Sequence, residues 1–364
     1  MKNLFVRILS CLLYLGWANM GAQNPDTKVV LITLDGFRWQ ELFTGADPEL
    51  VANTTYVHDT TGLKHLFWRD SATERRAVLM PFIWNKVSKI GQIHGNRVLG
   101  SEVDLTNSMW FSYPGYNEIL TGKADDQRIT SNDKVDNPNM TILEIANRDA
   151  RYRGKVGAFG SWDVFPYIIN EKRSGVPVNA GFELAEGDDL TSTEQLLNRM
   201  QPKVPSPWGT VRLDAFTHYY AMEYMKKSHP NLIYIAYGET DDFAHDGNYE
   251  AYLKSAHATD IMIKELWEFC QGDTFYKDNT LFLITTDHGR GTQPLKTWKS
   301  HGDQVNGADQ VWIIAFGKGV TPTGEVHSRE QLNSTQIAPT VLNILDLEAK
   351  NNRAMGSGLK LDNR

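Results

Sequence analysis

Six side chains of the kinds that bind divalent cations each come after a run of apolar residues in this sequence. Carboxylate oxygens and imidazole nitrogens are the ligands that zinc-type ions prefer. One aspartate after a strand more often caps the next helix, and one histidine is more often a loop residue, so no member is informative alone. Together they predict a site for two divalent cations of the zinc type, with ligands Asp35, Asp241, His245, Asp287, His288 and His301.

Two cations roughly 4 Å apart suit in-line displacement at phosphorus, because they stabilise both the attacking and the leaving oxygen. Such a site also needs a nucleophile. The segment FSYPGYNEILTG, residues 111–122, offers Ser112 ahead of an apolar stretch with helical character. A serine in this place often only caps the helix. Beside a metal, however, its hydroxyl would lose its proton readily and become an alkoxide nucleophile.

The elements that must position these residues alternate between short apolar runs and longer helical patterns. Such alternation predicts an α/β fold, a three-layer sandwich with a central, mostly parallel sheet and helices on both faces. Ligands of such sheets gather beyond the carboxyl ends of the strands, where the six candidates fall. The expected strands are 28–34, 155–159, 232–237, 280–286 and 311–316, and the expected helices are 141–148, 213–227, 249–269 and 334–345.

Two stretches fit this alternation poorly, about 44–110 and 170–208, and are expected to be insertions that cover the sheet rather than build it. Residues 36–111 separate the first candidate ligand from the candidate nucleophile, so both ends of this segment are held at the site. Part of it is therefore expected to form a lid or wall beside the metals. Its aromatic residues include Trp39, Phe67, Trp68, Trp84 and Trp110.

Composition excludes several classes of protein. The chain of 364 residues is 41% hydrophobic and 22% charged, which is enough apolar material for a large core and excludes a disordered chain. A formal charge of −7 leaves no basic surplus to neutralise a nucleic-acid backbone, so nucleic-acid binding is not expected as the primary role. The oligomeric state stays open.

The first 22 residues have the layout of a secretory signal peptide, because Lys2 and Arg7 precede an apolar run that ends near Gly21 and Ala22. The run is too short to span a bilayer. Cleavage would take the charge from −7 to −9 and give an exported, periplasmic or secreted catalytic domain of residues 23–364 with no transmembrane segment. Lipidation at Cys11 is the alternative.

Taken together, the motifs resemble those of the alkaline phosphatase superfamily, most closely its type I phosphodiesterase and nucleotide pyrophosphatase branch. The resemblance covers about residues 28–346. The matching motifs are LDG at 34–36, S-Y-P-G-x-x-x-I-L-T-G at 112–122, D-x-x-x-H at 241–245, TDHG at 286–289 and HG at 301–302.

The resemblance implies one metal held by Asp241, His245 and His301, and a second held by Asp35, Asp287, His288 and the Ser112 oxygen. It also implies a covalent intermediate on Ser112 that water then hydrolyses. An asparagine about twenty residues after the nucleophile commonly contacts a substrate oxygen in this family. Asn132 lies nearest that spacing, although Asn137 and Asn139 are close by.

The sequence departs from the family pattern in ways that leave the ester open. Ser112 stands where the phosphodiesterase branch usually has threonine, and Tyr116 occupies the arginine position of the sulfatase motif, which disfavours a sulfatase. The basic candidates for a monoesterase are Arg38, Lys172 and Arg173, and no motif places them at the metals. We therefore expect a small phosphodiester or nucleotide-like substrate. The alternatives are a phosphomonoesterase, a sulfate-ester hydrolase, or a non-catalytic metal or carbohydrate-binding protein.

Overall fold

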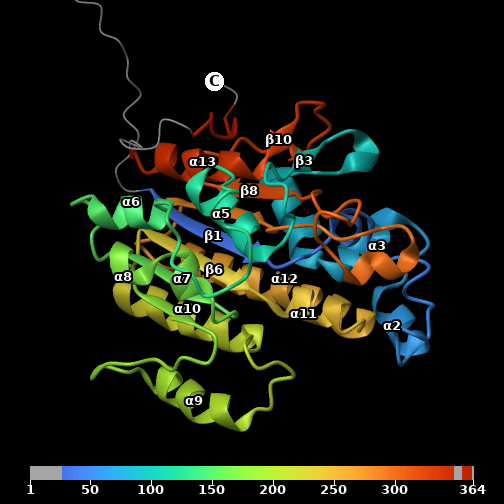
Figure 1. Cartoon of the computed structure of the whole chain (residues 1–364), viewed down its shortest axis with the longest axis horizontal. Coiled ribbons are helices and arrows are strands. Elements are labelled where there is room, and N and C mark those ends of the chain that lie inside the picture. The colour runs from blue at the N-terminus through green and yellow to red at the C-terminus, as the bar shows by residue number, and fades with distance from the viewer. Residues whose placement is uncertain (1–26, 348–354, 363–364) are drawn as a thin grey trace, which may run out of the picture.

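A computed structural model describes residues 27–347 and 355–362, and an eight-stranded sheet runs through its centre (Figure 1). The central strand β1 pairs in parallel with β6 on one side and β7 on the other, so Leu34 lies beside Tyr237 and Thr33 beside Thr285. In spatial order the strands are β5 (Val178–Ala180), β4 (Val156–Gly160), β6 (Leu232–Tyr237), β1 (Lys28–Leu34), β7 (Thr280–Thr285), β8 (Ile313–Gly317), β2 (Gly91–His94) and β9 (Gly324–Glu325).

Both faces of this sheet are buried, because alternate residues of β1 enter two different hydrophobic cores. Val30 and Ile32 belong to one core, and Val29 and Leu31 belong to the other. The first core is covered by α1 (Trp39–Thr44), α2 (Thr60–Phe67), α3 (Ala72–Leu79), α10 (Asp214–Ser228) and α12 (Tyr249–Gly272). The second is covered by α5 (Ser112–Thr121), α6 (Ile142–Arg148), α7 (Phe165–Ile168) and α13 (Ile337–Ile344).

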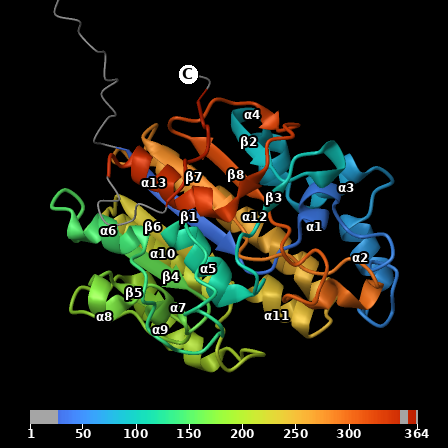
Figure 2. The same cartoon turned by 45° about the horizontal axis from the view of Figure 1, so that its top comes forward.

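Shorter elements fill the connections between these layers. A second, two-stranded sheet pairs β3 (Val103–Asp104) with β10 (Leu332–Asn333). Figure 2 shows α5 and α13 in front of the sheet, with α5 near the end of β1. The remaining helices are α4 (Ser88–Ile90), α8 (Glu171–Ser174), α9 (Ser192–Met200), α11 (Glu239–His245), a π-helix at Ile83–Val87 and 3-10 turns at Arg97–Leu99, Gln201–Lys203, Leu295–Lys299 and Ser334–Gln336.

The predicted three-layer α/β architecture is confirmed, and β1 and β6 have the predicted bounds. The expectation that the two irregular stretches only cover the sheet is wrong, because β2 and β5 are strands of that sheet. Both are short, and polar residues interrupt their apolar pattern. In β2 a Cβ on Gly91 would lie 2.4 Å from the carbonyl oxygen of Ala315, so the close pairing with β8 needs glycine there.

The predicted signal peptide at 1–22 and the alternative lipidation site Cys11 lie outside the described residues. Within residues 27–347 and 355–362, no helix combines the length and apolar character needed to cross a membrane. Cys270 is buried there as a free thiol.

Candidate metal centre

Three adjacent strands bring the predicted ligands to one edge of the sheet. Asp35 directly follows β1, Asp241 lies in α11 just after β6, and Asp287 follows β7. Because these three strands are parallel neighbours, their carboxyl ends meet. We call the resulting group the edge cluster; its members are Asp35, Asp241, His245, Asp287, His288 and His301.

Atoms of the edge cluster lie close enough to share cations. Asp35, Asp287 and His288 form one group, and Asp241, His288 and His301 form another, each with its ligand atoms within 4.8 Å of one another. His245 joins the second group, since its Nε2 lies 2.9 Å from Nε2 of His301. The structure thus brings all six predicted ligands together.

His288 lies at the centre of the edge cluster. Its Nε2 is 3.3 Å from Oδ1 of Asp35, 3.5 Å from Oδ1 of Asp241 and 3.6 Å from Oδ2 of Asp287. Its Nδ1 lies 2.9 Å from the carbonyl oxygen of Gly289, which can only accept, so Nδ1 donates this bond and Nε2 is the nitrogen that faces the carboxylates. This is the orientation that a metal-binding imidazole requires. The sequence assigned His288 to one group, whereas the structure places it between both.

The turn after β1 holds the carboxylates close to one another. Gly36 adopts the left-handed region at φ 58°, and its N–H donates to Oδ1 of Asp287 at 3.0 Å. A Cβ on Gly36 would come within 2.7 Å of Oδ1 of Asp241. Glycine is therefore needed here both for the backbone conformation and for the close approach of α11.

The electrostatics of the edge cluster favour a bound cation. Burial, followed by the charge of Asp241, raises the pKa of Asp35 well above its usual value, and burial followed by Asp35 does the same to the pKa of Asp287. Burial followed by His288 lowers the pKa of His301 to about 2, which keeps this imidazole neutral. Oδ1 of Asp35 and Oδ2 of Asp287 are buried without a hydrogen-bond partner. Unpartnered buried acceptors are costly, and a divalent cation fits this donor set.

The candidate nucleophile lies beside this cluster at the start of α5. Ser112 is the first helical residue and is buried, and its Oγ lies 3.4 Å from Nε2 of His288. It does not cap the helix, since Phe111 occupies the cap position. A Cβ on Gly115 would lie 2.2 Å from the carbonyl oxygen of Asp287, so only glycine lets α5 approach the end of β7 this closely.

Asn132 lies next to Ser112, as the family spacing implies. Its side-chain oxygen accepts the N–H of Tyr113 at 2.9 Å, which orients the amide nitrogen away from that bond. Asn137 and Asn139 instead donate to the side-chain oxygen of Asn117, further along α5. Of the three asparagines, Asn132 is thus the one beside the nucleophile.

Two buried residues at the site were missed by the sequence reasoning. Arg290 directly follows TDHG, is fully buried, contacts the Asp241 carboxylate and donates from Nε to the carbonyl oxygen of Gly36 at 3.1 Å. Burial alone would raise the pKa of Asp241, but Arg290, with His245 and His301, holds it well below its usual value. Tyr116 donates its hydroxyl to Oδ2 of Asp35 at 2.7 Å. Only the proximity of Arg290 and Tyr116 to recognised motifs could have indicated these roles.

The three basic residues considered for a monoesterase are engaged elsewhere. Arg38 is buried in an ion pair with Glu41, and Arg173 pairs with Glu144 at 2.7 Å. Lys172 is exposed, with its Nζ 4.0 Å from Asp136.

The expectation that aromatic residues of the segment 36–111 form a wall beside the metals is also largely wrong. Phe67 and Trp84 are buried in the first core, Trp68 stacks with the Arg75 guanidinium, and Trp39 bonds to Gln310. Phe67 and Trp84 are therefore core residues, and Trp39 and Trp68 pack partly against that core. The backbone of Trp110 does contact a residue next to the cluster, since its carbonyl oxygen accepts the N–H of Gly302 at 2.9 Å.

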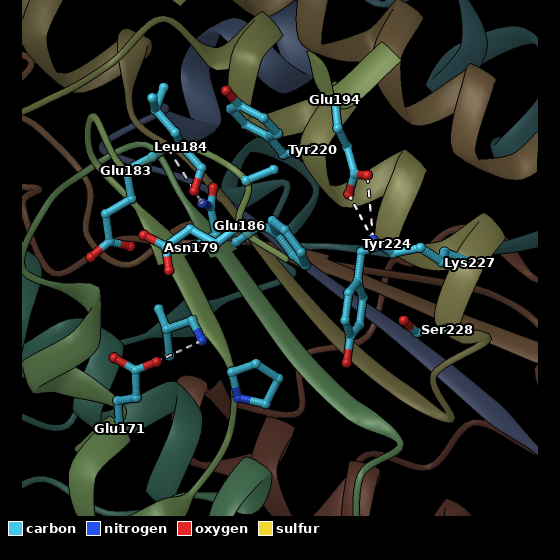
Figure 3. A pocket seen from close by; sticks show the side chains of 14 residues that line it. Glu171, Asn179, Glu183, Leu184, Glu186, Glu194, Tyr220, Tyr224, Lys227 and Ser228 are labelled. Atoms are coloured by element: carbon cyan, nitrogen blue, oxygen red, sulfur yellow. Dashed lines mark hydrogen bonds and ion pairs between the residues drawn. The ribbon is translucent and has the colours of Figure 1, made fainter. Parts of the chain in front are cut away.

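A separate cavity of about 450 Å³ lies between β5 and α10, with Tyr220, Tyr224 and the Glu194–Lys227 ion pair in its wall (Figure 3). None of its lining residues belongs to the edge cluster.

Comparisons with known proteins show which families and folds this chain resembles. A family described as the Metalloenzyme superfamily matches residues 191–349, which include five of the six candidate ligands, all except Asp35. A 2,3-bisphosphoglycerate-independent phosphoglycerate mutase from Gracilaria tenuistipitata var. liui is 29% identical over 131 residues, or 36% of this chain and 24% of the mutase. The chain thus matches about a quarter of that relative's length.

Solved structures resemble nearly the whole chain. A variant of the alkaline phosphatase PafA superposes with a TM-score of 0.61 at 11% identity, covering 92% of this chain and 98% of PafA. The lipoteichoic acid synthase LtaP from Listeria monocytogenes gives a TM-score of 0.59 at 12% identity, covering 91% and 75%. The chain therefore has the fold of the alkaline phosphatase superfamily, and its residues 191–349 match the Metalloenzyme superfamily.

Proposed function

We propose that this chain is a hydrolase of phosphoric esters that uses two divalent cations and Ser112 as its nucleophile. The observation that carries the proposal is the placement of Ser112 Oγ 3.4 Å from His288, beside two buried carboxylate oxygens that lack hydrogen-bond partners. Bound divalent cations supply Lewis acidity and stabilise charge on the attacking and leaving oxygens. The chain's own residues hold and orient the reacting groups.

Ser112 Oγ forms a bond to phosphorus as the bond from phosphorus to the leaving ester oxygen breaks, and the serine proton passes to the departing oxygen or to solvent. Water then attacks phosphorus, breaks the bond to Ser112 and restores the hydroxyl. Asn132 lies where its amide nitrogen can donate to a substrate oxygen beside Ser112. His288 belongs to both candidate metal groups, so it would help to hold either cation.

We propose a phosphodiester, or a nucleotide-like ester, as the substrate rather than a monoester. A monoester carries an extra negative charge that positioned Lys or Arg usually neutralises. Arg38, Lys172 and Arg173 do not supply it, and Arg290 is too deeply buried to reach a substrate. The aromatic residues of the segment 36–111 give little support to this choice, because Phe67 and Trp84 are buried in the core and Trp39 and Trp68 pack partly against it.

The test of the ester is a side-by-side measurement of kcat/KM for an aryl phosphate diester, the matching monoester and an aryl sulfate. We expect the diester to be turned over most efficiently. A strong monoester preference that collapses in Lys172→Ala, but not in Lys134→Ala, would contradict this assignment. Efficient sulfate cleavage with little phosphate turnover would contradict the phosphoric ester.

We further propose zinc as the metal and export as the destination. Elemental analysis of the purified protein should then find zinc in preference to other divalent cations. N-terminal sequencing of protein from the producing cell should find a start close to Gln23. A mature chain that begins at Met1, or one with a lipid on Cys11, contradicts cleavage at this site.

A further inference from the structure

Tyr116 links the helix of the nucleophile to the first candidate ligand. It follows Ser112 by four residues in α5, so the two side chains lie on the same face of the helix. The Tyr116 side chain is fully buried, and its ring makes an edge contact with Phe165 at 4.8 Å between centroids. Its position is therefore fixed by packing before any ligand binds.

The Tyr116 hydroxyl distinguishes the two oxygens of Asp35. It donates to Oδ2 at 2.7 Å, whereas Oδ1 is buried without a hydrogen-bond partner. The unpartnered Oδ1 is the oxygen that faces the edge cluster, 3.3 Å from Nε2 of His288. Without the hydroxyl, the carboxylate would lose the contact that prevents its rotation, and Oδ2 would become a second unsatisfied buried acceptor.

We propose that Tyr116 is a positioning residue that holds Asp35 in the orientation needed to bind the cation shared with Asp287 and His288. The inference rests on the proposed function only in requiring that the edge cluster binds metal. Residues that orient a metal ligand in this way typically contribute about 10–100-fold to metal affinity. Because Tyr116 shares α5 with Ser112, its bond to Asp35 also links the helix of the nucleophile to this ligand.

The test removes the hydroxyl oxygen of Tyr116 and changes nothing else in the side chain. Tyr116→Phe removes the hydroxyl and keeps the ring, so the packing against Phe165 is retained. Tyr234→Phe is the matched control, because Tyr234 is also fully buried and its hydroxyl bonds at 2.9 Å to Thr33, outside the edge cluster. The affinity of the full chain for zinc is measured by competition with a chromophoric chelator.

We expect Tyr116→Phe to weaken one of two zinc equivalents by about 10–100-fold and Tyr234→Phe to leave both at wild-type affinity. A double-mutant cycle provides a second measurement: in an Asp35→Asn background, Tyr116→Phe should have little further effect on zinc affinity. Unchanged affinity in Tyr116→Phe, or an equal loss in Tyr234→Phe, would overturn the inference while leaving the proposed function intact. A wild-type protein that binds no metal would overturn the proposed function itself.

Discussion

Two groups of buried charged residues lie close together in this protein, and they differ in how completely their polar atoms are paired. The Arg38 cluster consists of Arg38, Glu41, Tyr249 and Tyr252. Its guanidinium bonds to both Glu41 oxygens and donates to the carbonyl oxygen of Gly291 at 3.0 Å, and the Tyr249 hydroxyl donates to Glu41 at 3.0 Å. The cluster is closed, because each charge already has its partners.

The edge cluster lies close by, since its member His288 precedes Gly291 by three residues, yet the edge cluster is open. It gathers three carboxylates around one histidine and leaves Oδ1 of Asp35 and Oδ2 of Asp287 without partners. Burial cannot explain the difference, since Asp35 and Asp287 are buried, as Arg38 and Glu41 are. A fully paired cluster stabilises the fold, whereas an incompletely paired one has capacity to bind a ligand.

The largest effect should follow from removing the nucleophile beside the open cluster. Ser112→Ala is expected to lower turnover of an aryl phosphate diester by several powers of ten while metal content stays near wild type, because the carboxylate and imidazole ligands remain. Steady-state kinetics and elemental analysis on the same preparation check this. Ser112→Thr keeps the hydroxyl and is expected to retain part of the rate. Near-normal turnover in Ser112→Ala would exclude Ser112 as the nucleophile.

A substitution in the closed cluster should change the free energy of unfolding rather than the affinity for metal. Arg38→Met leaves the Glu41 carboxylate buried without its cation, which should lower the free energy of unfolding by about 3–5 kcal/mol whether or not metal is present. Urea unfolding with and without a chelator measures this.

Asp287→Asn is the matched change in the open cluster. It removes one of several mutually repelling carboxylates, so it should leave the chelated protein at least as stable as wild type and weaken metal binding. If Asp287→Asn strongly destabilised the chelated protein, the distinction between an open and a closed cluster would fail.

A third buried carboxylate lies between these extremes and should produce the smallest effect when the effect is counted per pH unit. Asp260 in α12 accepts the N–H groups of Phe82 and Ile83 at 2.7 and 2.9 Å, and burial raises its pKa to about 7. Its pKa in the unfolded chain is about 3.9, so between these values the folded state binds a proton that the unfolded state does not.

The contribution of Asp260 to the free energy of unfolding should therefore be greatest at low pH. It should fall as pH rises through about 7, by at most about 1.4 kcal/mol per pH unit. Urea unfolding of wild type and Asp260→Asn across this range isolates the contribution as the difference between the two slopes. Parallel slopes would show that Asp260 is not protonated in the folded protein.

The sequence predicted those features that depend on local pattern. Seven-residue β1 and six-residue β6 were recognisable because both faces of each are apolar, and their parallel pairing places Asp35 and Asp241 at one edge. The convergence of the six candidate ligands followed from this topology. Their roles as metal ligands stay predictions.

Features that depend on long-range packing could not be predicted. Nothing near Arg38 in the sequence indicates that it meets Gly291, and the contact between Tyr116 and Asp35 joins residues 81 positions apart. An arginine is normally exposed, so nothing in the sequence indicates that Arg290 is buried beside Asp241. The aromatic residues of the segment 36–111 likewise could not be divided between core and site by their spacing.

The most direct test of the two-metal account is a titration of metal-depleted wild-type protein with zinc, followed by turnover of an aryl phosphate diester. The account predicts that turnover is negligible without metal, rises as zinc is added and reaches its maximum near two equivalents per chain. Full turnover in protein shown by elemental analysis to contain no metal would contradict it.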